Sequence, residues 1–232
     1  MSEPAEARFC PASDQSLLVS FGEEITAAAH TKVRRFLRLL ESMRIPGVCN
    51  LHPAYSSVLI RFNLLEVSHA QLESLLRPAL RHLDELPLPE PRTVEIPVCY
   101  GGEFGVDLTD LAKTHAMSEE EVIALHSSAT YTVCFLGFVP GFAYLSGLPG
   151  ALATPRLASP RRTVPPGSVG IAGSQTGVYP LATAGGWRLI ARTPLRMFRP
   201  EAAEMNRLAI GDQVRFRSIA PGEFGRRFES CR

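Results

Sequence analysis

Glycine and proline are concentrated in one segment of the chain, and this restricts the fold more than any other feature. Between Gly137 and Gly186, fifty residues include ten glycines and seven prolines. Proline disrupts a helix interior and glycine weakens it, so this segment cannot form a long helix. Short strands joined by tight turns are expected instead. The clearest strands are predicted in GSVGIAG, WRLIAR and DQVRFRSI, which indicates a compact β-barrel or sandwich.

The first ninety residues alternate strand patterns with amphipathic helices. A helix is predicted over Thr26–Met43 with Thr26 as its cap, and a second helix follows a Ser68–Gln71 capping box. Strands are predicted at Gln15–Phe21, at residues 47–53 and 56–62, and at Arg92–Val98. The resulting β-α-β-β-α-β order is that of ferredoxin-like domains.

A stiff, proline-rich connector, Leu86–Pro91, precedes the last of these strands. We therefore expect an α+β protein, with a ferredoxin-like α+β domain over residues 1–91 and a β-barrel domain over residues 92–232. Two short helices are predicted early in the second domain. Asp107 is expected to cap the first of them, and Ser118 with Glu121 forms a capping box for the second.

The overall composition is that of an ordinary globular protein and excludes several classes of function. The net charge is only +1, so no global field favours nucleic acid or an anionic membrane as a partner. The start of the chain lacks a basic region followed by an apolar run, and no signal peptide is expected. The five cysteines are odd in number and widely spaced, which fits reduced thiols in a cytoplasmic protein.

Charge is distributed very unevenly in the second domain. The segment Val122–Pro200 contains seven arginines but no lysine, aspartate or glutamate. Arginine favours bidentate recognition of carboxylate or phosphate, and neighbouring glycines let backbone N–H groups approach an anion. We predict an anion-binding surface that includes Arg156, Arg162 and Arg192. The alternative is that three or four of the seven arginines pair with acids outside this segment.

Acid–base chemistry would require groups from beyond this acid-free segment. Glu103, in the glycine-rich YGGEFGVDL, is the candidate general base, and a turn or capping role is the alternative. His126, at the end of a predicted helix, is a second catalytic candidate, although a lone histidine at such a position is more often a satisfied structural residue. The six histidines are scattered without metal-ligand spacing, so no metal site is predicted.

Several long motifs resemble one protein family. They are IPVCYGGEFGVDL, GFVPGFAYLSGLP, ATPRLASPRRTVPPGSVGIAGSQTGVYPLATAGGWRLIARTPLRMF and GDQVRF. In order and spacing they resemble the B subunit of the bacterial ATP-dependent 5-oxoprolinase. The family also includes proteins called sporulation sensor-kinase inhibitor and allophanate hydrolase subunit 1. The resemblance implies a small α+β domain followed by a cyclophilin-like β-barrel.

The resemblance also implies an activity and partners. The B subunit would work with two partners, a homologous C subunit together with a separate A subunit, to open 5-oxo-L-proline to L-glutamate. ATP would be a second substrate, which a partner could bind. Because a lactam is a poor electrophile, phosphorylation of its oxygen would make ring opening feasible, and arginines would stabilise the anion formed.

The resemblance further points to individual site residues. It implies polar groups at Gln175, Tyr179 and Thr193. It also implies a groove wall formed by Pro140, Phe142, Tyr144 and Trp187. For Trp187, a place in the core is the alternative.

Three other functions remain open. A histidine-kinase inhibitor would need a large exposed apolar patch on its barrel. A subunit of a urea or amide carboxyltransferase would need a biotin-carrier partner. A prolyl isomerase is suggested by the barrel type alone, and fold does not imply function.

Overall fold

The structure is a computed structural model that describes residues 7–230, with side chains up to residue 227. The chain divides into two compact units, Met1–Glu90 and Pro91–Arg232. The cysteines at positions 10, 49, 99 and 134 are free, the first two exposed and the others buried, while Cys231 lies outside the described residues. Among the described residues, no helix is long and apolar enough to cross a membrane.

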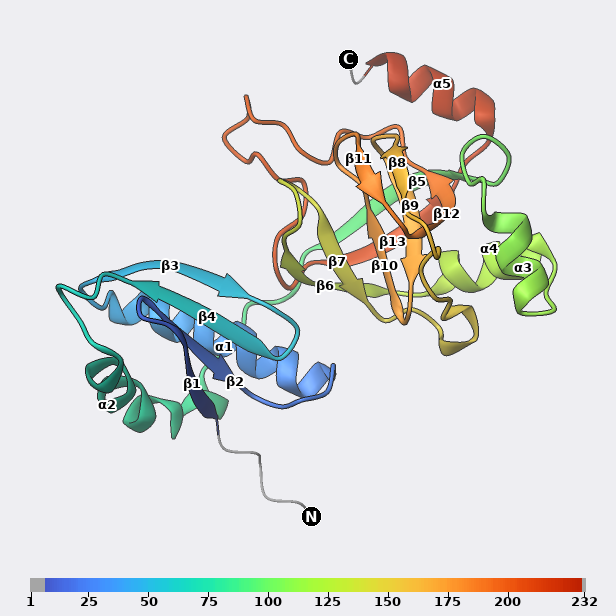
Figure 1. Cartoon of the computed structure of the whole chain (residues 1–232). Coiled ribbons are helices and arrows are strands. Elements are labelled where there is room, and N and C mark those ends of the chain that lie inside the picture. The colour runs from blue at the N-terminus through green and yellow to red at the C-terminus, as the bar shows by residue number, and fades with distance from the viewer. Residues whose placement is uncertain (1–6, 231–232) are drawn as a thin grey trace. The chain divides into compact units, whose positions relative to one another are not determined.

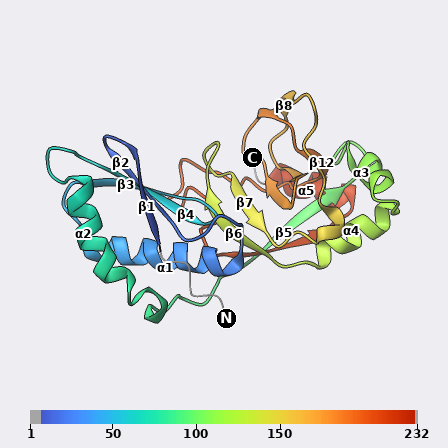
Figure 2. The same cartoon turned by 60° about the horizontal axis from the view of Figure 1, so that its bottom comes forward.

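The first unit is a four-stranded antiparallel sheet in the order β1-β2-β4-β3. Its elements are β1 (Arg8–Ser13), β2 (Ser16–Ser20), α1 (Ala27–Met43), β3 (Val48–Pro53), β4 (Ser57–Phe62), α2 (His69–Leu80) and the short 3-10 helix η1 (Leu83–Glu85). Both α-helices cover one face of the sheet (Figures 1 and 2). Alternate residues of β2 and β4, such as Leu17 and Ile60, meet Val33 and Phe36 of α1 in the core.

Local signals in this unit are confirmed, but the predicted order of its elements is wrong. Thr26 caps α1 by accepting a hydrogen bond from the Ala29 N–H at 3.1 Å, and Ser68 and Gln71 form the capping box of α2. However, the segment predicted as the last strand of this sheet is β5 (Thr93–Tyr100) of the second unit. The edge of the sheet is formed by β1 instead, which gives the order β-β-α-β-β-α.

Burial explains this difference. Residues Ile96 to Cys99 of β5 are all buried, as expected of a strand covered on both faces. Strand β1 is largely exposed and contains Pro11, which is tolerated at a sheet edge because its missing N–H faces no neighbouring strand. A short segment interrupted by a proline gave no strand signal in the sequence.

The second unit is built around a closed seven-stranded barrel in the order β10-β7-β6-β13-β5-β12-β9, which confirms the barrel prediction. The remaining barrel strands are β6 (Tyr131–Leu136), β7 (Ala143–Ser146), β9 (Ser168–Ala172), β10 (Gln175–Val178), β12 (Arg188–Arg192) and β13 (Gln213–Ser218). Strands β8 (Arg161–Val164) and β11 (Thr183–Gly185) form a separate two-stranded ribbon. The parallel pairing of β5 with β13, from Thr93 opposite Gln213 onwards, completes the barrel.

Helices lie at the ends of this barrel. They are α3 (Leu108–Thr114), α4 (Glu119–Ser128), the 3-10 helix η2 (Gly150–Leu152) and α5 (Pro221–Ser230). Figures 1 and 2 show α3 and α4 side by side. The predicted Ser118–Glu121 capping box starts α4, as expected. Alternate strand residues such as Val98, Val133 and Leu145 fill the barrel interior.

The opposite face of β7, β10 and β12 carries an aromatic cluster, formed by Phe142, Tyr179 and Trp187. The ring of Phe142 lies 5.2 Å from that of Tyr179 and 5.4 Å from that of Trp187. Glycines make room for these rings, because a Cβ at Gly177 would lie 3.2 Å from Trp187 Cζ3 and 2.9 Å from the Ala143 carbonyl oxygen. Much of the glycine content in this segment therefore serves close packing.

Candidate functional site

Two predicted site residues from distant parts of the sequence meet in a small cleft of the barrel unit. Glu103 lies in the turn after β5 and Arg192 at the end of β12, and both line a cleft of about 210 Å³. The other lining residues are Phe104, Val106, Arg161, Pro165, Ser168 and Leu189. The cleft thus carries an exposed carboxylate together with a half-buried guanidinium.

The orientation of Arg192 is fixed by the loop between β8 and β9. Its Nε–H donates to the Pro166 carbonyl oxygen at 2.9 Å. Partial burial lowers the pKa of the Arg192 guanidinium, and the charge of Glu103 acts in the opposite direction. The planar guanidinium is therefore held in place beside a carboxylate, an arrangement suited to binding an anionic group through paired hydrogen bonds.

Glycine allows the turn that carries Glu103 to lie against β12. A Cβ at Gly105 would overlap the Ile190 carbonyl group, so only glycine fits there without displacement of the backbone. The N–H of Asp107 donates to the Leu189 carbonyl oxygen at 2.9 Å, and that of Gly101 to the Ile190 carbonyl oxygen at 3.1 Å. These contacts bring Glu103 to the cleft.

The predicted capping role of Asp107 is wrong. Asp107 stands at the N-cap position of α3, but its side chain makes no capping hydrogen bond. Instead, its Oδ1 accepts from Arg161 Nη2 at 2.6 Å and its Oδ2 accepts from the Leu189 N–H at 2.7 Å. Asp107 is only 7% exposed in its side chain and satisfies two donors, so the Asp107–Arg161 ion pair forms a fixed wall of the cleft.

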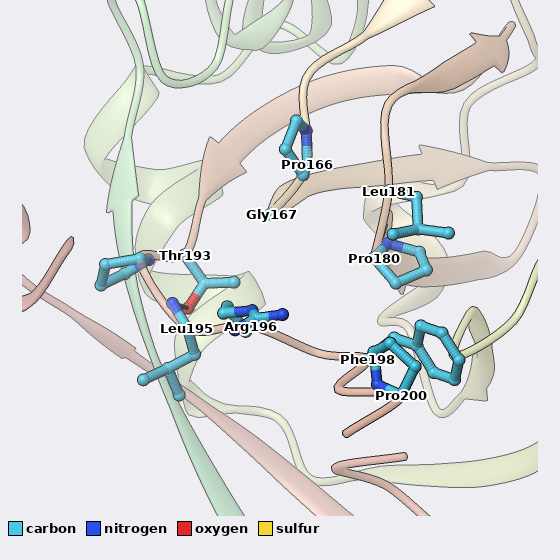
Figure 3. A pocket seen from close by; sticks show the side chains of 10 residues that line it. Pro166, Gly167, Pro180, Leu181, Thr193, Leu195, Arg196, Phe198 and Pro200 are labelled. Carbon is cyan, nitrogen blue, oxygen red and sulfur yellow. Dashed lines mark hydrogen bonds between the residues drawn. The ribbon is translucent and has the colours of Figure 1, made fainter. Parts of the chain in front are cut away.

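A larger pocket of about 490 Å³ is lined by Pro166 and Gly167 of the same loop (Figure 3). Thr193, Leu195 and Arg196 face Pro180, Leu181 and Phe198 across it, as Figure 3 shows. Thr193 itself is buried, and its Oγ1 accepts from the Leu195 N–H at 3.2 Å. The lining is mainly apolar, so this pocket differs in chemistry from the cleft of Glu103 and Arg192.

The other predicted residues do not join either cavity. Arg156 is exposed, with its guanidinium carbon 5.9 Å from the centre of the Trp187 ring, and Tyr144 stacks on Phe135 at 4.4 Å. Phe142, Tyr179 and Trp187 are buried in the aromatic cluster, which favours packing over the predicted groove wall and polar contact. Gln175 and Arg162 lie on β10 and β8, and Pro140 borders a separate open hollow with Phe138 and Met205.

His126 belongs to a buried network. Its Nδ1 lies 2.7 Å from Tyr100 Oη and its Nε2 lies 3.2 Å from Thr176 Oγ1. Because Thr176 Oγ1 donates to the Gly170 carbonyl oxygen at 2.9 Å, it accepts from Nε2–H, and Nδ1 then accepts from the Tyr100 hydroxyl. Burial lowers the pKa of His126 to about 3. A neutral histidine with both nitrogens bonded and no exposure is a structural group, and we leave it out of the candidate site.

Two arginines of the acid-free segment form ion pairs with described residues. Arg161 pairs with Asp107, and Arg196 with Glu201 at 3.0 Å, and both acids lie outside the acid-free segment. Sequence reasoning missed the role of Arg161 because nothing local distinguishes it from Arg162. Within the described part of the chain, no three histidine, cysteine or acidic side chains are grouped so that they could hold a metal ion.

Comparisons with known proteins identify relatives over nearly the whole chain. A family model described as "Carboxyltransferase domain, subdomain C and D" matches residues 7–208. The protein of Bacillus subtilis (strain 168) that is named as the B subunit of 5-oxoprolinase is 42% identical over 221 residues. These residues cover 91% of this chain and 92% of that protein.

Solved structures share the fold. The structure of TTHA0988 is 34% identical with a TM-score of 0.77, and the match covers 90% of this chain but only 40% of that longer chain. The urea carboxylase of Kluyveromyces lactis has a TM-score of 0.79 at 19% identity, over 100% of this chain and 23% of the enzyme, which shows a common fold. This chain therefore belongs to the carboxyltransferase-domain family of subdomains C and D, alongside the proteins named as the B subunit of 5-oxoprolinase.

Proposed function

We propose that this chain is a subunit of an ATP-dependent 5-oxoprolinase, which opens 5-oxo-L-proline to L-glutamate. The observation that carries the proposal is the cleft in which Glu103 and Arg192 meet, within a chain that is 42% identical to a protein named as the B subunit of 5-oxoprolinase. The cleft offers one fixed guanidinium and one exposed carboxylate to a small anionic substrate.

Each charged group has a definite task in this proposal. Arg192 binds the substrate carboxylate or a phosphoryl group on the lactam oxygen, because its planar guanidinium matches two oxygens at once. Glu103 is the general base that removes a proton from the attacking water. The Asp107–Arg161 ion pair supports the cleft as a fixed wall, because the hydrogen bonds of Arg161 are largely used within the fold.

The chain is proposed to be half of a composite site. Its partners would be a homologous C subunit together with a separate A subunit, with ATP supplied from a partner's site. The TTHA0988 chain supports this idea. The region similar to this chain makes up only 40% of TTHA0988, so in that protein it is joined to further residues in one longer chain. The chain alone is accordingly expected to be inactive.

Reconstitution tests the proposal directly. The chain is combined with its candidate A and C partners, and glutamate formation from 5-oxoproline and ATP is measured with each chain omitted in turn. Arg192→Ala removes a charge-assisted contact of about 1.5–3 kcal/mol and should lower kcat/KM by roughly 10- to 150-fold. Arg215→Ala, an exposed arginine on β13 away from the cleft, is the matched control.

The results of this reconstitution test the role of Arg192 and the role of the whole chain separately. Wild-type kcat/KM in the Arg192→Ala enzyme would exclude Arg192 from the site, while activity without this chain would reject the whole proposal. If an assembled complex is inactive on 5-oxoproline, the next substrates to test are urea and other amides, in the presence of a biotin-carrier partner. This choice follows the carboxyltransferase description of the family.

A binding role is the second candidate function. The open hollow bordered by Pro140 also contains Phe138, which is 60% exposed, and Met205, which is 49% exposed. Exposed apolar side chains of this kind are typical of protein-binding surfaces, including that of a kinase inhibitor. Direct binding to a sensor-kinase dimerisation domain, with Phe138→Asp as the test variant, would distinguish this function from catalysis.

A further inference from the structure

We infer that the C-terminal helix α5 positions Arg192, and that Phe224 is the residue through which it does so. This inference rests on the proposed role of the cleft. Helix α5 and the preceding strand β13 lie beyond residue 208, where the family match ends, so the match itself assigns them nothing. Figure 1 shows α5 (red) starting beside the loop that follows β5 (green).

Phe224 packs close to two residues that line the cleft. Its side chain is 7% exposed and packs with Ile219 and Cys99 in a small apolar cluster. Its ring centre is 4.6 Å from that of Phe104, a cleft-lining residue, and the Arg192 guanidinium carbon lies 5.9 Å from the Phe224 ring centre. The Phe224 ring therefore contacts two residues that line the cleft, Phe104 and Arg192.

Strand register explains why Arg192 meets this ring. Arg192 on β12 stands opposite Cys99 on β5, and residues directly opposite each other in a sheet project to the same face. Cys99 belongs to the Phe224 cluster, so Arg192 leaves the sheet on the face that α5 covers. The Pro166 carbonyl oxygen holds Nε and the Phe224 ring holds the flat guanidinium by a cation–π contact, which together fix its orientation.

Charges set how α5 docks. Glu223 Oε1 accepts from Arg217 Nη2 at 3.1 Å and from Arg227 Nε at 2.8 Å. Arg217 Nε also donates to Glu95 on β5 at 2.7 Å. The residue next to Phe224 is thus tied to both β13 and β5, which fixes the rotation of α5 with the Phe224 ring facing the barrel.

The test separates ring contact from helix docking. Phe224→Leu keeps an apolar side chain but removes the π face, and Phe224→Tyr keeps that face. Cys99 is buried beneath the helix, so its alkylation rate, followed by mass spectrometry of the Cys99 peptide, reports whether α5 remains docked. The Arg192 Nε–H signal in ¹⁵N-labelled full-length chain reports the position of the guanidinium relative to the ring.

Phe224→Leu should shift the Arg192 Nε–H signal, leave Cys99 protected, and raise KM in the assembled enzyme by about 2- to 10-fold with kcat little changed. Phe224→Tyr should restore both the signal and KM, and Phe224→Leu should have no further effect on KM in an Arg192→Ala background. An unchanged signal and KM in Phe224→Leu with Cys99 protected would overturn the inference. If the wild-type assembly opens no lactam, the proposed function fails, but the Arg192 signal still decides whether Phe224 positions it.

Discussion

Two sets of polar side chains in the barrel unit differ in how their charges and hydrogen bonds are used. His126 and Asp107 are buried, and hydrogen bonds within the fold occupy both ring nitrogens of His126 and both carboxylate oxygens of Asp107. Glu103 is exposed and Arg192 half-buried, and both face a cleft. The fold depends on the first set, whereas the second set remains accessible to a ligand.

The comparison shows that residue type alone does not indicate function in this chain. Arg161 and Arg192 come from the same acid-free segment and line the same cleft. Arg161 pairs with the buried Asp107 carboxylate and also donates to the Trp187 carbonyl oxygen, and these contacts make it a structural residue. Mutations at the two sets should therefore separate stability from activity.

The largest effect on stability is expected at Asp107. Asp107→Ala would leave Arg161 without its carboxylate and the Leu189 N–H without an acceptor, at a cost of about 3–5 kcal/mol in the free energy of unfolding. Urea denaturation measures it, and Asp110→Ala on the exposed side of α3 is the matched control. Equal stability of both variants would mean that Asp107 is not structural.

An intermediate effect on stability is expected when the pH is lowered, because His126 is buried in its neutral form. The pKa of His126 is about 3 in the folded chain and near 6.5 in the unfolded chain, where the ring is exposed. Between pH 3 and pH 6.5 the unfolded chain therefore binds more protons than the folded chain. The free energy of unfolding should therefore fall as pH drops below 6.5, by about 2 kcal/mol between pH 7 and pH 5.

A His126→Gln variant serves as the reference for this pH dependence, since it removes the ionisable group and should show a flatter profile. If that variant does not fold, NMR titration of the His126 ring in the wild-type chain gives the same information. A ring that titrates near pH 6.5 would contradict its assignment to the buried set.

The smallest effect on stability is expected at Glu103. Glu103→Gln should change the free energy of unfolding by no more than about 0.5 kcal/mol, because the side chain is exposed. In the reconstituted enzyme it should lower kcat by at least about 100-fold if the carboxylate is the general base. A large loss of stability with normal kcat would reverse the comparison and make Glu103 structural.

Local sequence signals predicted much of the fold. Thr26 and the two capping boxes start helices as expected, and the strand segments around Val169 and Ile190 lie in the barrel. Such signals succeed because a cap or an alternating pattern depends on a few neighbouring residues. The barrel was also expected, and the buried position of Trp187 fits the alternative of a core residue rather than the predicted groove wall.

Elements that depend on distant contacts were missed. Strand β1 contains Pro11, and α5 contains Pro221, Gly222 and Gly225, so neither has the composition of its class. Helix α5 is held by Phe224 and by the ion pair of Glu223 with Arg217, which forms only when β13 is in place. For the same reason, the sequence could propose Arg192 and Glu103 as site residues but could not show that they share a cleft.

The parallel pairing of β5 with β13 has a consequence for synthesis on the ribosome. The first unit contains all its own strands by Phe62 and can fold while the rest of the chain is being made. The barrel cannot close until Gln213–Ser218 have emerged, so β5 remains unpaired on that side until nearly the whole chain has been made. Non-local contacts of this kind slow folding and leave apolar strands temporarily exposed to aggregation. A nascent chain stalled before residue 213 should therefore contain a folded first unit followed by an open, chaperone-dependent segment.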